Sequence, residues 1–209
     1  MAEATRLPGD VLIGGNLVVG GDLPVYPRSR LRQENEAVLD LPLESFRVHD
    51  AYATNLPGTS AADDLALVGG TFGTNGPAIE TYDVKAAGSQ TLRARTRFKL
   101  PPEYIATETV KLRIKAGMVT SIADVACTVD AEARKSDGFG GVGADLVSDA
   151  AQSINSLTPG AFTFRITAAS LAPGDEIDLR ITIAANDAAT VTAVIARIGE
   201  IALLLDIKG

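Results

Sequence analysis

The sequence of 209 residues contains no tryptophan, one cysteine (Cys127) and one histidine (His49). One cysteine excludes an internal disulfide, and one histidine leaves carboxylates as nearly all of the available metal ligands. No apolar run reaches the roughly 18 to 20 residues of a membrane span, and the first residues lack the basic and apolar regions of a secretory signal. The sequence therefore predicts no metal site, no membrane partner and folding in a reducing cytoplasm.

Charge is unevenly distributed along the chain. The formal net charge is −7 at pH 7, so nucleic acid is not an expected partner. The segment 85–115, however, holds eight basic residues against two acidic ones. Seven of them alternate with apolar residues on two expected neighbouring strands and share one face: Arg93, Arg95, Arg97, Lys99, Lys111, Arg113 and Lys115.

Two interpretations of this basic face remain open. Seven cations on adjacent strands repel one another unless acidic residues alternate with them. Acids on other strands can supply such an intrasheet charge ladder: Asp124, Asp130, Glu132, Glu176 and Asp178. Otherwise the face, with Arg93, Arg95 and Arg97 at its centre, is a contact for an acidic protein surface.

The segment 61–209 alternates between apolar and polar residues in strand after strand. Leu92, Ala94 and Thr96 share one face of the clearest example, and a period of two marks a strand with one buried face. About eight such strands, separated by turn signals, predict an all-β fold, an antiparallel β-sandwich or jelly roll. Cys127 falls on an inward position and is expected in the core.

Residues 9–23 carry a six-residue repeat of Gly, Asp or Asn, three apolar residues and Gly. Glycine pairs supply the corners, and so short a module cannot bury its own apolar side chains. We therefore expect residues 1–23 to form an oligomerisation stem with sister chains through Val11, Ile13, Leu17 and Val19. Residues 24–60 contain four prolines and are expected to be an extended arm drawn over its own domain or over a neighbour.

The glycine-rich loop 138–143 matches G-x-G-x-x-G and precedes 144–154, which we expect to be a short helix. A dinucleotide site also needs a second parallel strand after that helix. None is expected here, so the pattern predicts a flexible loop and no cofactor.

Catalytic and metal sites are not predicted either. His49 lies in the proline-rich arm, which offers no rigid partner for acid–base chemistry. Asp137, Asp145 and Asp149 lack the spacing of a calcium loop. The sequence therefore predicts no catalytic residue and no enzyme activity.

The hexads, typified by residues 15–19 (Gly-Asn-Leu-Val-Val), together with the arm and the sandwich resemble virion proteins of tailed bacteriophages. The segment 171–183 also resembles strands of jelly-roll modules in capsid decoration and head-fibre proteins. This resemblance implies a homotrimeric structural protein on the capsid surface of the virion, made in the host cytoplasm. Its expected partner is the major capsid protein, contacted through Arg28, Arg30, Arg32, Arg93, Arg95 and Arg97.

An alternative is a tail-fibre, baseplate or receptor-binding module that recognises host-surface carbohydrate. The low aromatic content, 5% of the residues, argues against it because sugar sites commonly use stacking rings. A glycan array distinguishes the two.

Overall fold

Two antiparallel sheets make up the framework of the computed structural model, which describes residues 34–189 and 191–208. Eleven strands and one 3-10 turn are found in this part: β1 (Glu34–Asp40), η2 (Leu43–Ser45), β2 (Ala66–Val68), β3 (Ala78–Glu80), β4 (Gly88–Lys99), β5 (Val110–Met118), β6 (Ala126–Ser136), β7 (Val142–Asp145), β8 (Gln152–Ser153), β9 (Gly160–Ile166), β10 (Glu176–Asp187) and β11 (Ala196–Lys208). Since η2 is the one helical element there, no helix is long and apolar enough to cross a membrane.

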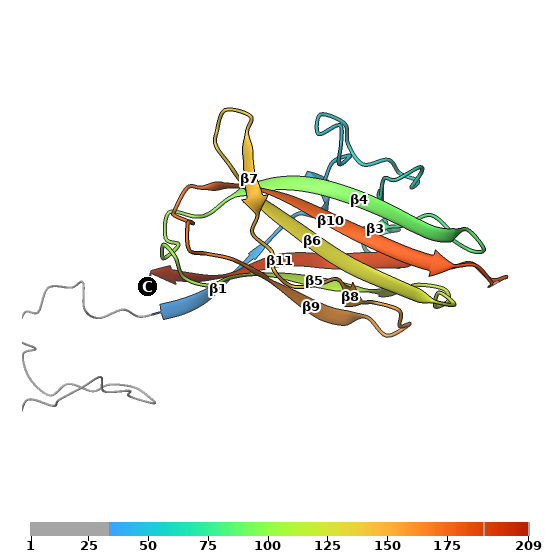
Figure 1. Cartoon of the computed structure of the whole chain (residues 1–209). Helices are drawn as coiled ribbons and strands as arrows, with labels where there is room; N and C mark the ends of the chain where they lie inside the picture. Colours follow the sequence, from blue (N-terminus) through green and yellow to red (C-terminus); the bar gives the residue numbers. More distant parts are fainter. Residues whose placement is uncertain (1–33, 190, 209) are drawn as a thin grey trace, which may run out of the picture. The chain divides into compact units, whose positions relative to one another are not determined.

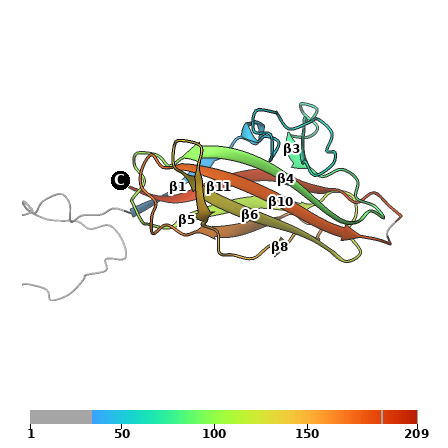
Figure 2. The same cartoon turned by 45° about the horizontal axis from the view of Figure 1, so that its top comes forward.

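The sheets form the two layers of a sandwich (Figure 1). Sheet A has the order β2-β3-β11-β5-β9, with β1 also paired to β11. Sheet B has the order β4-β10-β6-β7, with β8 also paired to β6. Figure 2 shows β4, β10 and β6 side by side across the face of sheet B. The predicted antiparallel β-sandwich is confirmed, with more strands than the sequence suggested.

One hydrophobic core fills the space between the sheets, and it follows the predicted alternation. Leu92 and Ala94 of β4 are fully buried, as are Leu112 of β5 and Leu179 of β10. The intervening arginines of β4 face outward and stay partly exposed. Cys127 is buried in this core as expected, and burial raises the pKa of its thiol to about 12.

Residues 34–60 of the predicted arm lie on the sandwich of their own chain. β1 pairs with β11 from Glu34–Lys208 to Asp40–Ala202. The chain then crosses to sheet B, where the Arg47 amide donates to the Arg95 carbonyl at 2.7 Å. Phe46, fully buried between these two contacts, anchors the crossing in the core. This segment covers the free edge of β4, which is one way that proteins protect an edge strand.

The predicted helix over 144–154 is wrong. β7 begins at Val142, and β8 follows at Gln152. Asp145 accepts hydrogen bonds from the amides of Ala133 and Val147 at 3.0 and 3.1 Å. Aspartate side chains that bind backbone amides in this way compete with helix formation, and pairing with β6 supplies an alternative that local sequence does not show.

The two basic strands are not neighbours. β4 lies at the edge of sheet B, whereas β5 lies inside sheet A between β11 and β9. The seven cations are therefore divided between two outer faces of the sandwich, and their mutual repulsion is smaller than the sequence suggested.

Candidate functional site

The outward side chains of β4, β10 and β6 in sheet B form two rows of register partners. One row is Arg97, Asp178 and Arg134, and the next is Arg95, Arg180 and Glu132. The strands place them there because inward neighbours such as Leu179 and Ile181 belong to the core and side chains alternate along a strand. Charged groups of both signs thus face one another across three strands.

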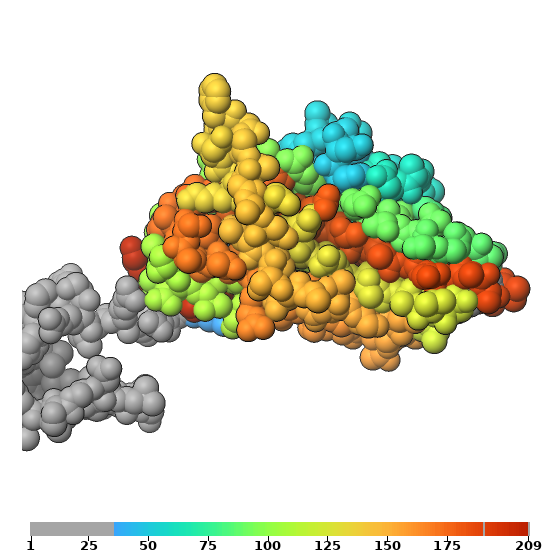
Figure 3. Space-filling model, viewed as in Figure 1, coloured from blue at the N-terminus to red at the C-terminus, as the bar shows by residue number. Residues whose placement is uncertain are grey.

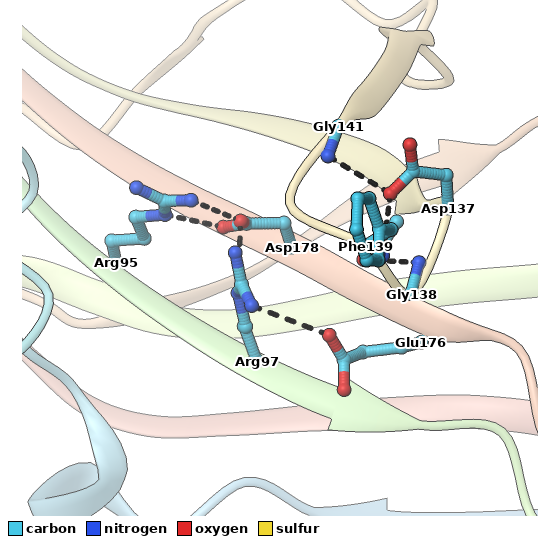
Figure 4. A network of polar contacts seen from close by, with 9 residues as sticks. Arg95, Arg97, Asp137, Gly138, Phe139, Gly141, Glu176 and Asp178 are labelled. Carbon is cyan, nitrogen blue, oxygen red and sulfur yellow. Dashed lines mark hydrogen bonds and ion pairs between the residues drawn. The ribbon is translucent and has the colours of Figure 1, made fainter.

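Asp178 is the centre of the first row. It is 6% exposed and accepts hydrogen bonds from Arg95 Nε at 2.5 Å and from Arg97 Nε at 3.1 Å. A second nitrogen of Arg95 also binds it, which makes a bidentate pair. Figure 4 shows both guanidinium groups converging on this carboxylate. We call Arg95, Arg97, Asp178 and Glu176 the arginine network, since Arg97 also contacts Glu176 at 3.4 Å.

The network fixes the charge of Asp178. Burial alone would raise the pKa of this carboxyl group. The hydrogen bond and the charge of Arg95, reinforced by Arg97, outweigh burial and lower the pKa below its ordinary value of 3.8. Asp178 is therefore ionised at neutral pH, and it raises the pKa of Arg95 in turn.

Arg180 occupies the middle of the second row and is less well satisfied. It pairs with Glu132 through one terminal nitrogen. Its other register partner is Arg95, a like charge. Its Nε atom is buried and has no hydrogen-bond partner among the described residues. An unsatisfied buried donor costs roughly 1 to 3 kcal/mol of stability. Arg180 is therefore the least favourably placed charged residue of the two rows.

Two walls rise beside these rows. One is the β6–β7 hairpin, whose tip is held by Asp137: its Oδ1 atom accepts from the amides of Phe139 and Gly141, both at 2.8 Å. Figure 4 shows this loop beside the arginine network. Gly138 adopts a φ of +76° there, which suits glycine. Phe139 is fully exposed.

The other wall is the segment 46–64. Its Tyr52 ring lies over two guanidinium groups, with centroid distances of 5.5 Å to Arg95 and 5.3 Å to Arg97. Cation–π contacts of this kind hold arginine side chains in place. Figure 3 shows the hairpin and this segment as two ridges on one side of the molecule.

A groove of about 210 Å³ lies between the walls. Its lining is polar apart from Val142 and comprises His49, Arg95, Glu132, Arg134, Val142, Asp178 and Arg180. Three arginines against two carboxylates leave this region with excess positive charge, in a chain whose net charge is −7. The groove is the candidate functional site.

Five of the seven cations of the predicted basic face meet acids within the fold. Arg93 contacts Asp63 at 3.4 Å, and Arg95 and Arg97 belong to the arginine network. Two of the acids considered for a charge ladder, Glu176 and Asp178, are the ones used. On sheet A, separate pairs form between Arg113 and Glu200 at 2.7 Å and between Lys111 and Glu36 at 3.9 Å.

His49 has an acidic neighbour at each of its ring nitrogens. Its Nε2 atom lies 3.3 Å from Asp63, and its Nδ1 atom lies 3.3 Å from Asp64. Ligand atoms of His49, Asp50 and Asp64 lie within 4.8 Å of one another. Exposed acidic groups commonly gather without an ion, and nothing else at this place indicates one.

The glycine-rich loop and the aspartates singled out in the sequence lie in hairpins and loops of the sandwich. The G-x-G-x-x-G loop is the tip of the β6–β7 hairpin, and antiparallel pairing replaces the strand–helix context that a dinucleotide site needs. Asp137 and Asp149 each bind backbone amides, Asp149 that of Arg165 at 2.5 Å. The expected stem residues Val11, Ile13, Leu17 and Val19, and the expected contacts Arg28, Arg30 and Arg32, lie outside the described residues.

Sequence reasoning missed Arg180 and Tyr52. Arg180 had a signal, because it follows the outward phase of β10 between inward Leu179 and Ile181. Tyr52 had none, since its position depends on how a loop returns to β4 from the other sheet.

No protein-family model and no curated protein matches the chain. Among solved structures, the xylan-binding module CBM15 is similar at 12% identity, covering 84% of this chain and 100% of its own, with a TM-score of 0.46. The CBM22-1 xylan-binding domain of Paenibacillus barcinonensis Xyn10C is 14% identical over 70% of this chain and 82% of its own, with a TM-score of 0.37. At such values the similarities carry no conclusion about what this chain binds.

Proposed function

We propose that the protein is a non-catalytic structural protein of a bacteriophage particle, a homotrimeric decoration protein that binds the major capsid protein on the outside of the head. The observation that carries this proposal is the glycine-cornered repeat of residues 9–23 in front of a β-sandwich. Residues 34–189 and 191–208 enclose a hydrophobic core of their own, whereas the repeat is too short to bury its own apolar side chains.

The mechanism follows from assembly. Three stems pool apolar side chains that one stem cannot bury, and the trimer carries three copies of each capsid-binding group. Binding across subunit boundaries stabilises a shell because only the assembled lattice offers the complete site.

Ion pairs within the sandwich bear on which arginines we propose as capsid contacts. Arg95 and Arg97 are engaged by Asp178 and Glu176, and Arg93 is engaged by Asp63. Using them for docking would break these pairs. We therefore assign the proposed contact first to Arg28, Arg30 and Arg32.

Deletion of residues 1–23 tests the stem. We expect the full chain to sediment as a trimer and the shortened chain to sediment as a monomer with unchanged β-sheet circular dichroism, because the core of residues 34–208 remains. A shortened chain that keeps the mass of the full chain would remove the stem from the proposal.

A second candidate function, recognition of host-surface carbohydrate, is favoured by the groove on sheet B. Planar guanidinium and carboxylate groups there point into a hollow between two walls, and sugar hydroxyls are bound by such groups. A glycan array probed with the full chain tests it. Reproducible binding to glycans supports carbohydrate recognition, and no binding to any glycan leaves the decoration role as the remaining candidate.

A further inference from the structure

The groove contains an arrangement of charge that the fold by itself leaves unexplained. Arg95 and Arg180 are direct register partners on β4 and β10. Like charges in that position destabilise a sheet. Each guanidinium turns away from the other, Arg95 toward Asp178 and Arg180 toward Glu132, and the groove lies over the place where they diverge.

Among the residues that line the groove, three guanidinium groups face two carboxylates, and Asp130 lies near Arg180 as well. Asp178 is shared by Arg95 and Arg97, and Glu132 lies near both Arg180 and Arg134, 3.9 Å from the latter. The Nε atom of Arg180 has no hydrogen-bond partner within residues 34–189 and 191–208, although 40% of that side chain is exposed. Arg95 gives its Nε and one terminal nitrogen to Asp178, so a ligand in the groove can use its other terminal nitrogen without breaking that pair.

We propose that the groove binds one anionic group between Arg95 and Arg180, and that this group is the carboxylate of an acidic sugar residue. Arginine binds carboxylates through two parallel N–H bonds, and an anion here also relieves the repulsion between the two cations. That the anion belongs to a sugar rests on the second candidate function. Inorganic sulfate would bind two arginines through the same chemistry, so the experiment must distinguish the two.

The size of the groove limits the proposed occupant. About 210 Å³ is less than the roughly 300 to 1,000 Å³ of most ligand pockets, so the groove has room for no more than one sugar ring. Val142, the apolar member of the lining, offers a surface to the C–H groups of such a ring, and the open sides leave room for the rest of a saccharide chain.

The experiment titrates the full chain, labelled with ¹⁵N, and follows the Nε–H signals of its arginines. The probes are trigalacturonate, its methyl ester, which differs in lacking the negative charge, and sodium sulfate. We expect trigalacturonate to shift the Arg180 signal and the methyl ester to leave it unchanged.

Variants test the assignment. Arg180→Gln should weaken trigalacturonate binding at least tenfold, and Arg180→Lys, which keeps the charge without the fork, should weaken it less. Arg113→Gln is the matched control, because Arg113 is paired with Glu200 on sheet A, outside the groove. It should bind as the unaltered chain does, and thermal melting of each variant verifies that it is folded.

Each outcome is decisive. A shift with sulfate and none with trigalacturonate would uphold the anion site and overturn the sugar source. No shift with either probe, or equal binding by Arg180→Gln, would overturn the inference. Neutral hits on the glycan array combined with no trigalacturonate shift would overturn the inference while leaving the second candidate function standing.

Discussion

The outer faces of the two sheets carry similar charged side chains but pair them differently. On sheet B, Arg95 and Arg97 both bind one carboxylate, Asp178, whose side chain is 7% exposed. On sheet A, Arg113 binds Glu200, whose side chain is 42% exposed. Isolated exposed pairs contribute about 0 to 1 kcal/mol. The difference indicates that the stability of sheet B depends strongly on one shared, buried acid. On sheet A, each separate ion pair contributes only a little to stability.

Substitutions in the core beneath both faces should cause the largest losses of stability. Phe164 of sheet A and Leu179 of sheet B are fully buried in one cluster. Replacing either by alanine should lower the free energy of unfolding by about 3 to 5 kcal/mol, from lost burial and the cavity left behind. Urea denaturation measures it. A large loss from one sheet and almost none from the other would contradict a single shared core.

A smaller effect distinguishes the two faces directly. Asp178→Asn should cost about 2 to 3 kcal/mol at pH 7, because two arginines lose a charged acceptor. Glu200→Gln, the matched change on sheet A, should cost no more than about 0.5 kcal/mol. Equal losses in urea denaturation would show that sharing and burial of the carboxylate do not matter here.

The pH dependence refines this comparison. The pKa of Asp178 is lowered in the folded protein from its ordinary value of 3.8. Its contribution to stability is therefore complete above that value and is lost as the pH falls through the lower, native pKa. The stability difference between the unaltered chain and Asp178→Asn should stay constant from pH 7 to pH 5 and shrink below about pH 4. A difference that persists unchanged at pH 3 would contradict the pairing.

The fold was predictable where alternation is strong. The period-two patterns of β4, β5 and β10 predict which face of each strand is buried, and those faces are buried in the structure. The segment 34–40 gives no such pattern, because β1 owes its place to pairing with β11 at the far end of the sequence. The error at 144–154 has the same origin, since β7 forms against β6 while Asp145 satisfies backbone amides.

The candidate site was predictable only in its parts. The arginines of β4 and the acids Glu176 and Asp178 were identified as possible partners from their alternation. Their contacts depend on the register of β4 against β10, two strands that are separated by five others along the chain. No local pattern specifies that register, nor the return of Tyr52 to the same surface.

The central claim is that this chain is a component of phage heads, and the most direct test is the protein composition of the particles. Filled heads should be purified from lysed cells by density gradient and separated from tails, then analysed by mass spectrometry and labelled with antibody against the sandwich. The account predicts peptides of this chain in a fixed ratio to the major capsid protein and label on the outside of the head. Its absence from heads while it is abundant in the same lysate would contradict the account.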